Sequence, residues 1–256
     1  MNYPDFLFLI GGKDLEMEAI LHLLADNQLQ VADHHLTWGA KLSSYQSLFN
    51  DYQTFVGIEL IPDIELPNHY IEIDHHNKNS YKRSSLEQII ELLEKNLRLK
   101  IDFTRDLQLI AANDKGYVPA MFTMGAKLQE VADIRRRDRK AQGVTPEDEL
   151  LAEQSIRENL TIEGGITIVK SLTHHFSAVT DRLYPCDKLL VSHQNYFIYY
   201  GKGANLLSQK YNHLIAEKKA FYGGENTGFF GIAKEYFTIN EIEVLIDEII
   251  NLIQNS

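Results

Sequence analysis

Short apolar segments that alternate with helical ones are the feature that most constrains the fold of this chain. The first apolar run, Phe6 to Ile10, is uninterrupted and ends in Gly11-Gly12, as a buried parallel strand does where it enters a turn. Asp14 is suited to cap the helix that apolar residues at helical spacing predict behind it. This alternation predicts an α/β fold with a mostly parallel sheet flanked by helices.

Three parts are predicted along the 256 residues. Residues 1–128 form the parallel-sheet domain. Residues 129–163 are rich in charge, contain the helix start Thr145-Pro146-Glu147-Asp148, and are interpreted as a helical connector. Residues 164–256 are predicted to form a second, smaller mixed α/β domain. Beyond the first run, strands are predicted at 29–32, 54–60, 69–73, 166–170, 189–192 and 196–200, and helices at 105–113, 204–218, 240–253 and after Ser84 or Ser85.

Composition excludes several classes of protein. The chain has 36 acidic and 25 basic residues, a formal net charge of −11, and 44% hydrophobic residues, which together exclude a largely disordered chain. The acidic balance argues against binding long nucleic acid, which needs a broad basic surface, but it allows a small anionic ligand.

Cysteine content and terminal sequence bear on the cellular compartment. Cys186 is the one cysteine, so no intrachain disulfide can form, which suits a reducing compartment. The first residues lack the basic start of a signal peptide, and no apolar run approaches the roughly 18 residues that span a bilayer. We therefore expect a cytoplasmic protein that does not enter the membrane.

Histidine is distributed unusually. Six of the ten histidines form adjacent pairs, whereas random placement would give roughly 0.4 pairs. The pairs are His34-His35, His75-His76 and His174-His175. The second pair follows a predicted strand, so Asp74, His75 and His76 are placed at the carboxyl end of that strand, where parallel sheets bind ligands. Carboxylate and imidazole together suit manganese, zinc or iron more than calcium.

With this triplet the chain resembles the DHH phosphoesterase superfamily, which takes its name from the sequence Asp-His-His. Asp114 is similar to the lone downstream aspartate of that family, and residues 223–231 resemble the glycine-rich substrate loop of its associated DHHA1 domain. The superfamily includes RecJ-type exonucleases, nanoRNases, cyclic-dinucleotide phosphodiesterases and manganese pyrophosphatases. The resemblance implies an enzyme that hydrolyses a phosphoester or phosphoanhydride with a divalent metal, most simply Mn²⁺. It implies Asp74, His76 and Asp114 as metal ligands and His75 and His76 as catalytic groups.

The first motif of the family departs from its pattern here. The pattern is a histidine, three residues, an aspartate, one residue and a second aspartate. In the alignment we adopt, Gly12 stands at the histidine, and Glu16 and Glu18 stand at the two aspartates as candidate ligands. Acids are also favoured in a first helical turn by the helix dipole alone, so the alternative is a solvated helix start. The family also has an aspartate at its second strand. It should fall near residues 57–59, where Glu59 is the only acid.

A second triplet offers a possible replacement for the missing histidine. Asp33, His34 and His35 end an earlier predicted strand, and strand ends of one parallel sheet share an edge. We infer that one of the three supplies the metal ligand that Gly12 lacks. The alternative is an ordinary polar loop.

The substrate is bounded more loosely. The resemblance implies Lys115 and the loop residues Gly223, Gly224, Glu225 and Asn226 as substrate contacts, with a tight turn as the alternative for the glycines. We expect a small phosphorylated substrate or a short oligonucleotide, no long nucleic acid and no membrane partner, and a homodimer is compatible with the sequence. The rival function is a catalytically weakened protein that binds a nucleotide or anion without turnover, and the third is an interaction module.

Overall fold

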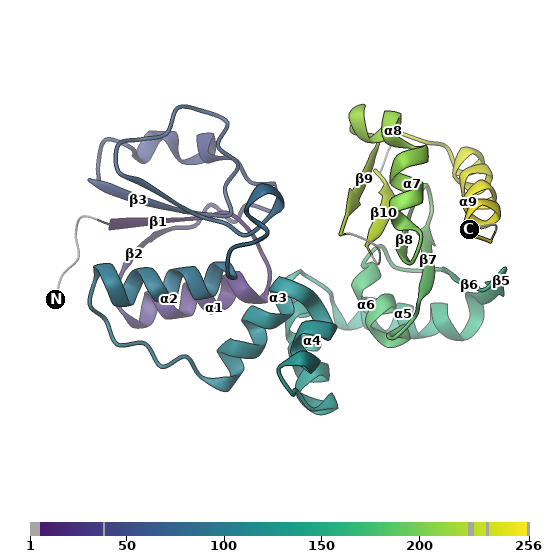
Figure 1. Ribbon diagram of the computed structural model, residues 1–256, viewed down its shortest axis with the longest axis horizontal. Helices are drawn as coiled ribbons and strands as arrows, with labels where there is room; N and C mark the ends of the chain where they lie inside the picture. The colour runs from purple at the N-terminus through teal and green to yellow at the C-terminus, as the bar shows by residue number, and fades with distance from the viewer. Residues whose placement is uncertain (1–5, 38, 225–227, 234–235, 255–256) are drawn as a thin grey trace. The chain divides into compact units, whose positions relative to one another are not determined.

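The chain forms two compact units, residues 1–143 and 144–256, in a computed structural model (Figure 1). The structure describes residues 6–37, 39–224, 228–233 and 236–254. Each unit has its own sheet and its own hydrophobic core. Within the described residues no helix is both long and apolar enough to cross a membrane.

The sheet of the first unit is parallel throughout. Its four strands run in the order β2 (Gln30–Ala32), β1 (Phe6–Ile10), β3 (Thr54–Ile58) and β4 (Tyr70–Ile73). Because all neighbours pair in parallel, the carboxyl ends of the four strands meet at one edge. The predicted α/β class is confirmed, and the predicted edge exists.

Both faces of this sheet are buried, which explains the uninterrupted apolar run. Phe8 and Ile10 pack against the helices, whereas Leu7 and Leu9 pack against the opposite layer around the 3₁₀ segment η1 (Leu42–Leu48). Tyr45 is fully buried in that layer, and its hydroxyl donates to the Ile10 carbonyl oxygen at 2.6 Å. The sequence of a strand that is covered on both faces does not alternate apolar and polar residues.

Four α-helices complete the first unit within its described residues, 6–37 and 39–143. They are α1 (Leu15–Asp26), α2 (Ser85–Asn96), α3 (Arg105–Thr123) and α4 (Leu128–Ala141). Asp14 caps α1 by accepting the Met17 N–H at 2.8 Å, and Ser84 caps α2 in a capping box with Glu87. The helix α3 bends at Gly116 and Tyr117, whose backbone angles are not helical. In Figure 1, α1 and α2 run side by side along one face of the sheet.

The charge-rich segment 129–163 is divided between the two units, so the structure does not form the separate connector that the sequence predicts. Val131 and Ile134 of α4 are buried in the same core as α1, and the Asp138 carboxylate accepts the Leu15 N–H at 3.2 Å. The next helix, α5 (Pro146–Asn159), buries Ala152 in a core cluster of the second unit. Composition does not predict this packing, because the few apolar residues that α4 buries are separated by charged ones.

The second unit has a six-stranded mixed sheet, and the predicted mixed α/β class of this part is confirmed. Its neighbours pair antiparallel except β6 and β7, which are parallel. The predicted helix 204–218 is broken at Tyr211. In sheet order the strands are β5 (Leu160–Glu163), β6 (Ile166–Lys170), β7 (Lys188–His193), β8 (Tyr196–Gly201), β10 (Phe229–Ile232) and β9 (Ala220–Gly223). Its helices are α5, α6 (Phe176–Thr180), α7 (Ala204–Lys210), α8 (Asn212–Ala216) and α9 (Ile239–Gln254).

The position of α4 predicts where the chain can be cut. A fragment of residues 1–143 should fold with a cooperative thermal transition, whereas a fragment of residues 1–128 should lose it. Removing α4 exposes the surface that Val131 and Ile134 cover, at about 1.5–3 kcal/mol for each side chain. That loss is a large share of the roughly 5–15 kcal/mol that holds a domain together. Circular dichroism during heating measures both fragments, and equal melting curves would contradict the boundary.

Candidate functional site

A buried imidazole forms the centre of the site. His75, two residues beyond β4, is 6% exposed, and its Nε2 atom faces three carboxylates. The distances from Nε2 are 2.5 Å to Asp114 Oδ2, 3.6 Å to Glu59 Oε1 and 3.7 Å to Glu16 Oε2. One donor atom from each of the four residues lies within 4.8 Å of the others. We call Glu16, Glu59, His75 and Asp114 the first donor group.

Four elements bring these side chains together. Glu59 and His75 follow β3 and β4, whose ends are adjacent in the sheet, and Glu59 has a left-handed backbone with φ of 53°. Glu16 lies in the first turn of α1, and Asp114 lies in α3 just before its bend. The site is therefore at the strand-end edge that the sequence predicts, completed by two helices.

Hydrogen bonds from α2 hold two of the carboxylates. Glu16 accepts the backbone N–H groups of Ser85 and Leu86 at 3.2 and 3.1 Å. Glu59 accepts the Ser85 hydroxyl at 2.8 Å. These donors belong to the first turn of α2, where the helix dipole favours negative charge. The amino terminus of α2 is therefore part of the site.

Crowding of buried acids shifts their pKa values upward. Burial, and then the charge of Asp114, raise the pKa of Glu16 well above its usual value, and the same causes raise the pKa of Glu59. Asp14 lies close enough to share the effect, because burial, Asp114 and Glu59 raise its pKa to about 7. A cation in the site would displace protons that these acids otherwise retain.

The pKa values of Asp114 and His75 shift in the direction opposite to the one that burial alone favours. Burial alone favours the neutral acid, but the adjacent His75 keeps the pKa of Asp114 below its usual value. Burial also disfavours an imidazolium, but Asp114 and then Glu59 raise the pKa of His75 above its usual value. Asp114 is therefore the acid of the group that ionises most readily.

The donor group fits a divalent transition metal. His75 Nε2 and Asp114 Oδ2 are buried and face each other, yet neither has an aligned hydrogen-bond partner among the described residues. Three carboxylates and one imidazole are a donor set that suits manganese, iron or zinc. An ion between them would satisfy both atoms.

Asp74 is not a member of the first donor group, although the sequence predicts it as a metal ligand. Its Oδ1 accepts the His76 N–H at 2.9 Å and lies 3.0 Å from His76 Nδ1, while its Oδ2 accepts the Asn79 amide at 2.9 Å. Although burial opposes it, the bonds from Asn79 and His76 hold the pKa of Asp74 below its usual value. Asp74 thus orients His76, which converges with Glu59 and His75 at the margin of the group.

The first motif is shifted by two residues from the alignment used above. Glu16 is 2% exposed, whereas Glu18 is exposed, because residues two apart on a helix point to opposite sides. The acids at the site are therefore Asp14 and Glu16. Counting the family spacing back from them places Ile10, a buried core residue, at the histidine position, in place of Gly12. Asp14 caps α1 and is not a member of the first donor group.

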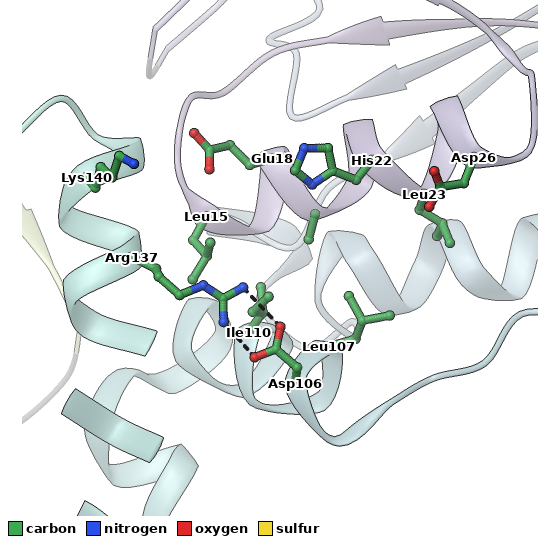
Figure 2. Close-up of a pocket in the computed structure, with 11 residues that line it drawn as sticks. Leu15, Glu18, His22, Leu23, Asp26, Asp106, Leu107, Ile110, Arg137 and Lys140 are labelled. Carbon is green, nitrogen blue, oxygen red and sulfur yellow. Dashed lines mark hydrogen bonds and ion pairs between the residues drawn. The ribbon is translucent and has the colours of Figure 1, made fainter. Parts of the chain in front are cut away.

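Glu18 instead lines a shallow pocket of about 430 Å³ between α1, α3 and α4. Figure 2 shows Glu18 among the lining residues with His22 and Lys140. Arg137 is paired to Asp106 there, at 2.6 and 3.0 Å. No member of the first donor group lines this pocket. The pocket is lined by the exposed Glu18 of α1, whereas the buried Glu16 of the same helix belongs to the first donor group.

The second triplet is not brought to the first donor group. The His34 ring stacks on Tyr45 with centroids 4.3 Å apart. Asp33 accepts the His35 N–H at 2.7 Å and lies 3.2 Å from His35 Nδ1, and the His35 side chain is 86% exposed. The converging donor groups found among the described residues include none of the three. Asp33 and His35 pair with each other, and His34 contacts Tyr45, so the placement gives no support to the replacement ligand.

The predicted substrate contacts are placed in part. Lys115 is exposed, and its ammonium group donates to the Ser80 carbonyl oxygen. Gly224 has a φ of 77°, and a Cβ there would lie 2.8 Å from the Gly228 Cα, so the turn itself requires glycine. Gly223 is the last residue of β9. Glu225 and Asn226 lie outside the described residues.

Comparison with known proteins places the fold. No protein family matches the sequence, and no curated protein matches it. Among solved structures, RecJ from Thermus thermophilus in complex with Mn²⁺ has a TM-score of 0.52 and 10% identity, over 98% of this chain and 52% of that chain. A pGpG-specific phosphodiesterase, PggH from Vibrio cholerae, has a TM-score of 0.44 and 14% identity, over 98% of this chain and 99% of that chain. The DHH domain of a member of a ribosomal protein family has a TM-score of 0.43 and 12% identity, over 92% of this chain and 74% of that chain.

The fold assignment depends on the first of these, whose TM-score is above 0.5. The chain therefore has a fold similar to that of RecJ, one of the proteins that the sequence resemblance leads us to expect.

Proposed function

We propose that this protein is a phosphoesterase that uses a divalent metal, with Mn²⁺ as the first candidate. The convergence of four donor atoms in the first donor group, from two buried and two partly buried residues, carries the proposal. The proposed substrate is a small nucleotide-like phosphoester or phosphoanhydride, or a short oligonucleotide. A net charge of −11 does not favour long nucleic acid.

Glu16, Glu59, His75 and Asp114 would hold the metal, and His76 lies at its margin. When bound, the ion would neutralise charge on the phosphoryl oxygens and acidify a water molecule. The acids must release their protons before they bind a cation, and the amino terminus of α2 stabilises their charged form. This reassigns the central ligand from Asp74 to His75.

His76 is the proposed proton carrier. Its side chain is 39% exposed, and the ionised Asp74 faces its Nδ1 atom at 3.0 Å, so the proton of the neutral ring lies on Nδ1. The Nε2 atom is then left to exchange a proton with the leaving group. Asp74 acts through His76 as a positioning residue. The substrate-binding roles of Lys115, Gly223 and Gly224 stay predictions.

A protein that binds a nucleotide without turnover is the second candidate. It is favoured by Asp74, which both His76 and Asn79 hold within its own turn, and by Ile10 at the place of the family histidine. Fewer free ligands weaken metal binding before they weaken the fold.

A turnover assay decides between the two functions. The full chain with Mn²⁺ should hydrolyse at least one of a linear dinucleotide such as pGpG, a five-nucleotide oligomer and bis(p-nitrophenyl) phosphate. Chelation should abolish hydrolysis, and Asp114→Asn should lower it at least about 100-fold, because it removes an anionic ligand. Binding of the dinucleotide in calorimetry with no hydrolysis of any substrate would establish the second function.

Two glutamates on one helix give a matched test of the metal site. Glu16→Gln should weaken Mn²⁺ binding at least about tenfold, because it removes a buried charge at the site. Glu18→Gln, the same change two residues away on the exposed side of α1, should leave affinity within about twofold. Calorimetric titration measures both, with circular dichroism to check folding. Equal effects would contradict the assigned side of the helix.

The shifted acids predict a pH dependence with a definite sign. The folded pKa of Asp14, about 7, lies above its ordinary value of 3.8, so the metal-free fold binds more protons than the unfolded chain. Its stability should therefore fall as pH rises from about 4 to about 7, and the raised pKa of His75 acts in the same direction above its ordinary value of 6.5. Mn²⁺ affinity should rise over the same interval.

Melting temperatures at several pH values, with and without Mn²⁺, measure this effect. Asp14→Asn serves as the control, because it removes one of the shifted acids and should flatten the slope. A metal-free melting temperature that rises across the interval would show that the acids are not protonated in the fold.

A further inference from the structure

The third histidine pair, in the second unit, has no role in the proposed reaction. His174 and His175 lie in the loop between β6 and α6. At that end of the sheet Lys170 pairs with Ser192, and His193 pairs with Tyr196. The glycine loop is at the other end, where Phe229 pairs with Tyr200. The histidine pair is therefore separate from the glycine loop.

A carboxylate from another element converges on this pair. Asp148, in the first turn of α5, has its Oδ2 atom 3.1 Å from His175 Nδ1. The two imidazole rings are 4.0 Å apart at an angle of 37°. One donor atom from each of Asp148, His174 and His175 lies within 4.8 Å of the others. We call these three residues the second donor group.

The surroundings hold the carboxylate and the loop in place. Asp148 accepts the Thr145 N–H at 2.9 Å and the hydroxyls of Thr145 and Thr173, both at 2.6 Å. The Thr173 hydroxyl in turn accepts the His175 N–H at 3.1 Å, and Thr173 is 2% exposed. The Tyr196 hydroxyl donates to the His174 carbonyl oxygen at 2.7 Å. Supporting bonds of this kind orient the ligands of metal sites.

One ring nitrogen in the group lacks a partner. His175 Nδ1 is buried and has no aligned hydrogen bond, although Asp148 Oδ2 lies 3.1 Å away. Ligand atoms bonded to zinc at about 2.1 Å stand roughly 3.4 Å apart in a tetrahedron. The observed separation of 3.1 Å is slightly shorter than this, so a small shift would let both atoms bind one ion.

We propose that Asp148, His174 and His175 bind a divalent transition metal, with zinc as the best match, at a site independent of the first donor group. Two imidazoles and one carboxylate are a common ligand set for zinc and leave a fourth position for water or an anion. The ion would join α5 to the loop before α6, because its ligands come from both.

The test is zinc binding by the full chain, measured by equilibrium dialysis and elemental analysis. Asp114→Asn provides a background in which the first donor group is weakened. In that background one equivalent of zinc should remain, and His174→Ala or His175→Ala should weaken its binding at least about tenfold. His213→Ala is the matched control, because it removes an exposed histidine of α8 from the same unit.

Cobalt provides a second readout that does not depend on activity. Co²⁺ added to the Asp114→Asn protein should give visible absorption bands that His174→Ala removes and His213→Ala retains. His174 is exposed, so its replacement decides the matter even if the His175 variant fails to fold. The proposal is overturned if the two pair variants bind zinc as tightly as the His213→Ala protein. Loss of hydrolysis with this binding retained would count only against the proposed function.

Discussion

Repulsion among buried carboxylates is the constraint on which the first unit depends. Glu16, Glu59 and Asp114 surround the Nε2 atom of His75, and all three are buried or partly buried. Two unit charges 4 Å apart repel by about 4 kcal/mol at an effective dielectric constant of about 20. One imidazole and one helix terminus cannot offset three such charges, so the fold must hold protons or a cation there. The raised pKa values of Glu16 and Glu59 express this requirement.

The same contacts connect the helices of the unit. Glu16 belongs to α1 and bonds to the start of α2, so a change at the site is also a change in helix packing. Beneath it, buried Arg135 donates to Asn113 at 2.9 Å and to Asp138 at 2.6 Å, fixing α4 against the residue that precedes Asp114. Such a network is stabilising only while every member is paired. Ligand binding and folding are therefore coupled in this unit.

The sequence predicted the four strands of the first sheet, β6 to β8 of the second, most helix starts and the edge at which the site lies, because local periodicity and capping determine these. It did not predict β5 or β9. It did not predict which acids face inward. Asp14 and Glu16 differ from Glu18 only by the rotation of α1 against the sheet, which depends on packing between distant segments. Nor did it predict the role of Asp74, which depends on Asn79 five residues later. The assignment of α4 failed for the same reason, since its apolar contacts lie far away in sequence.

The three histidine pairs show what turns such a pair into a possible metal site. The pair His34-His35 also has a carboxylate beside it. That carboxylate, Asp33, belongs to the same turn and pairs with His35. The other two pairs each meet a carboxylate delivered by a helix from elsewhere in the chain, at 2.5 Å in the first unit and 3.1 Å in the second. Asp148 also keeps its own bonds to Thr145 and Thr173. Adjacency of histidines in sequence is therefore not sufficient for a metal site, because a carboxylate from a separate element must also reach the pair.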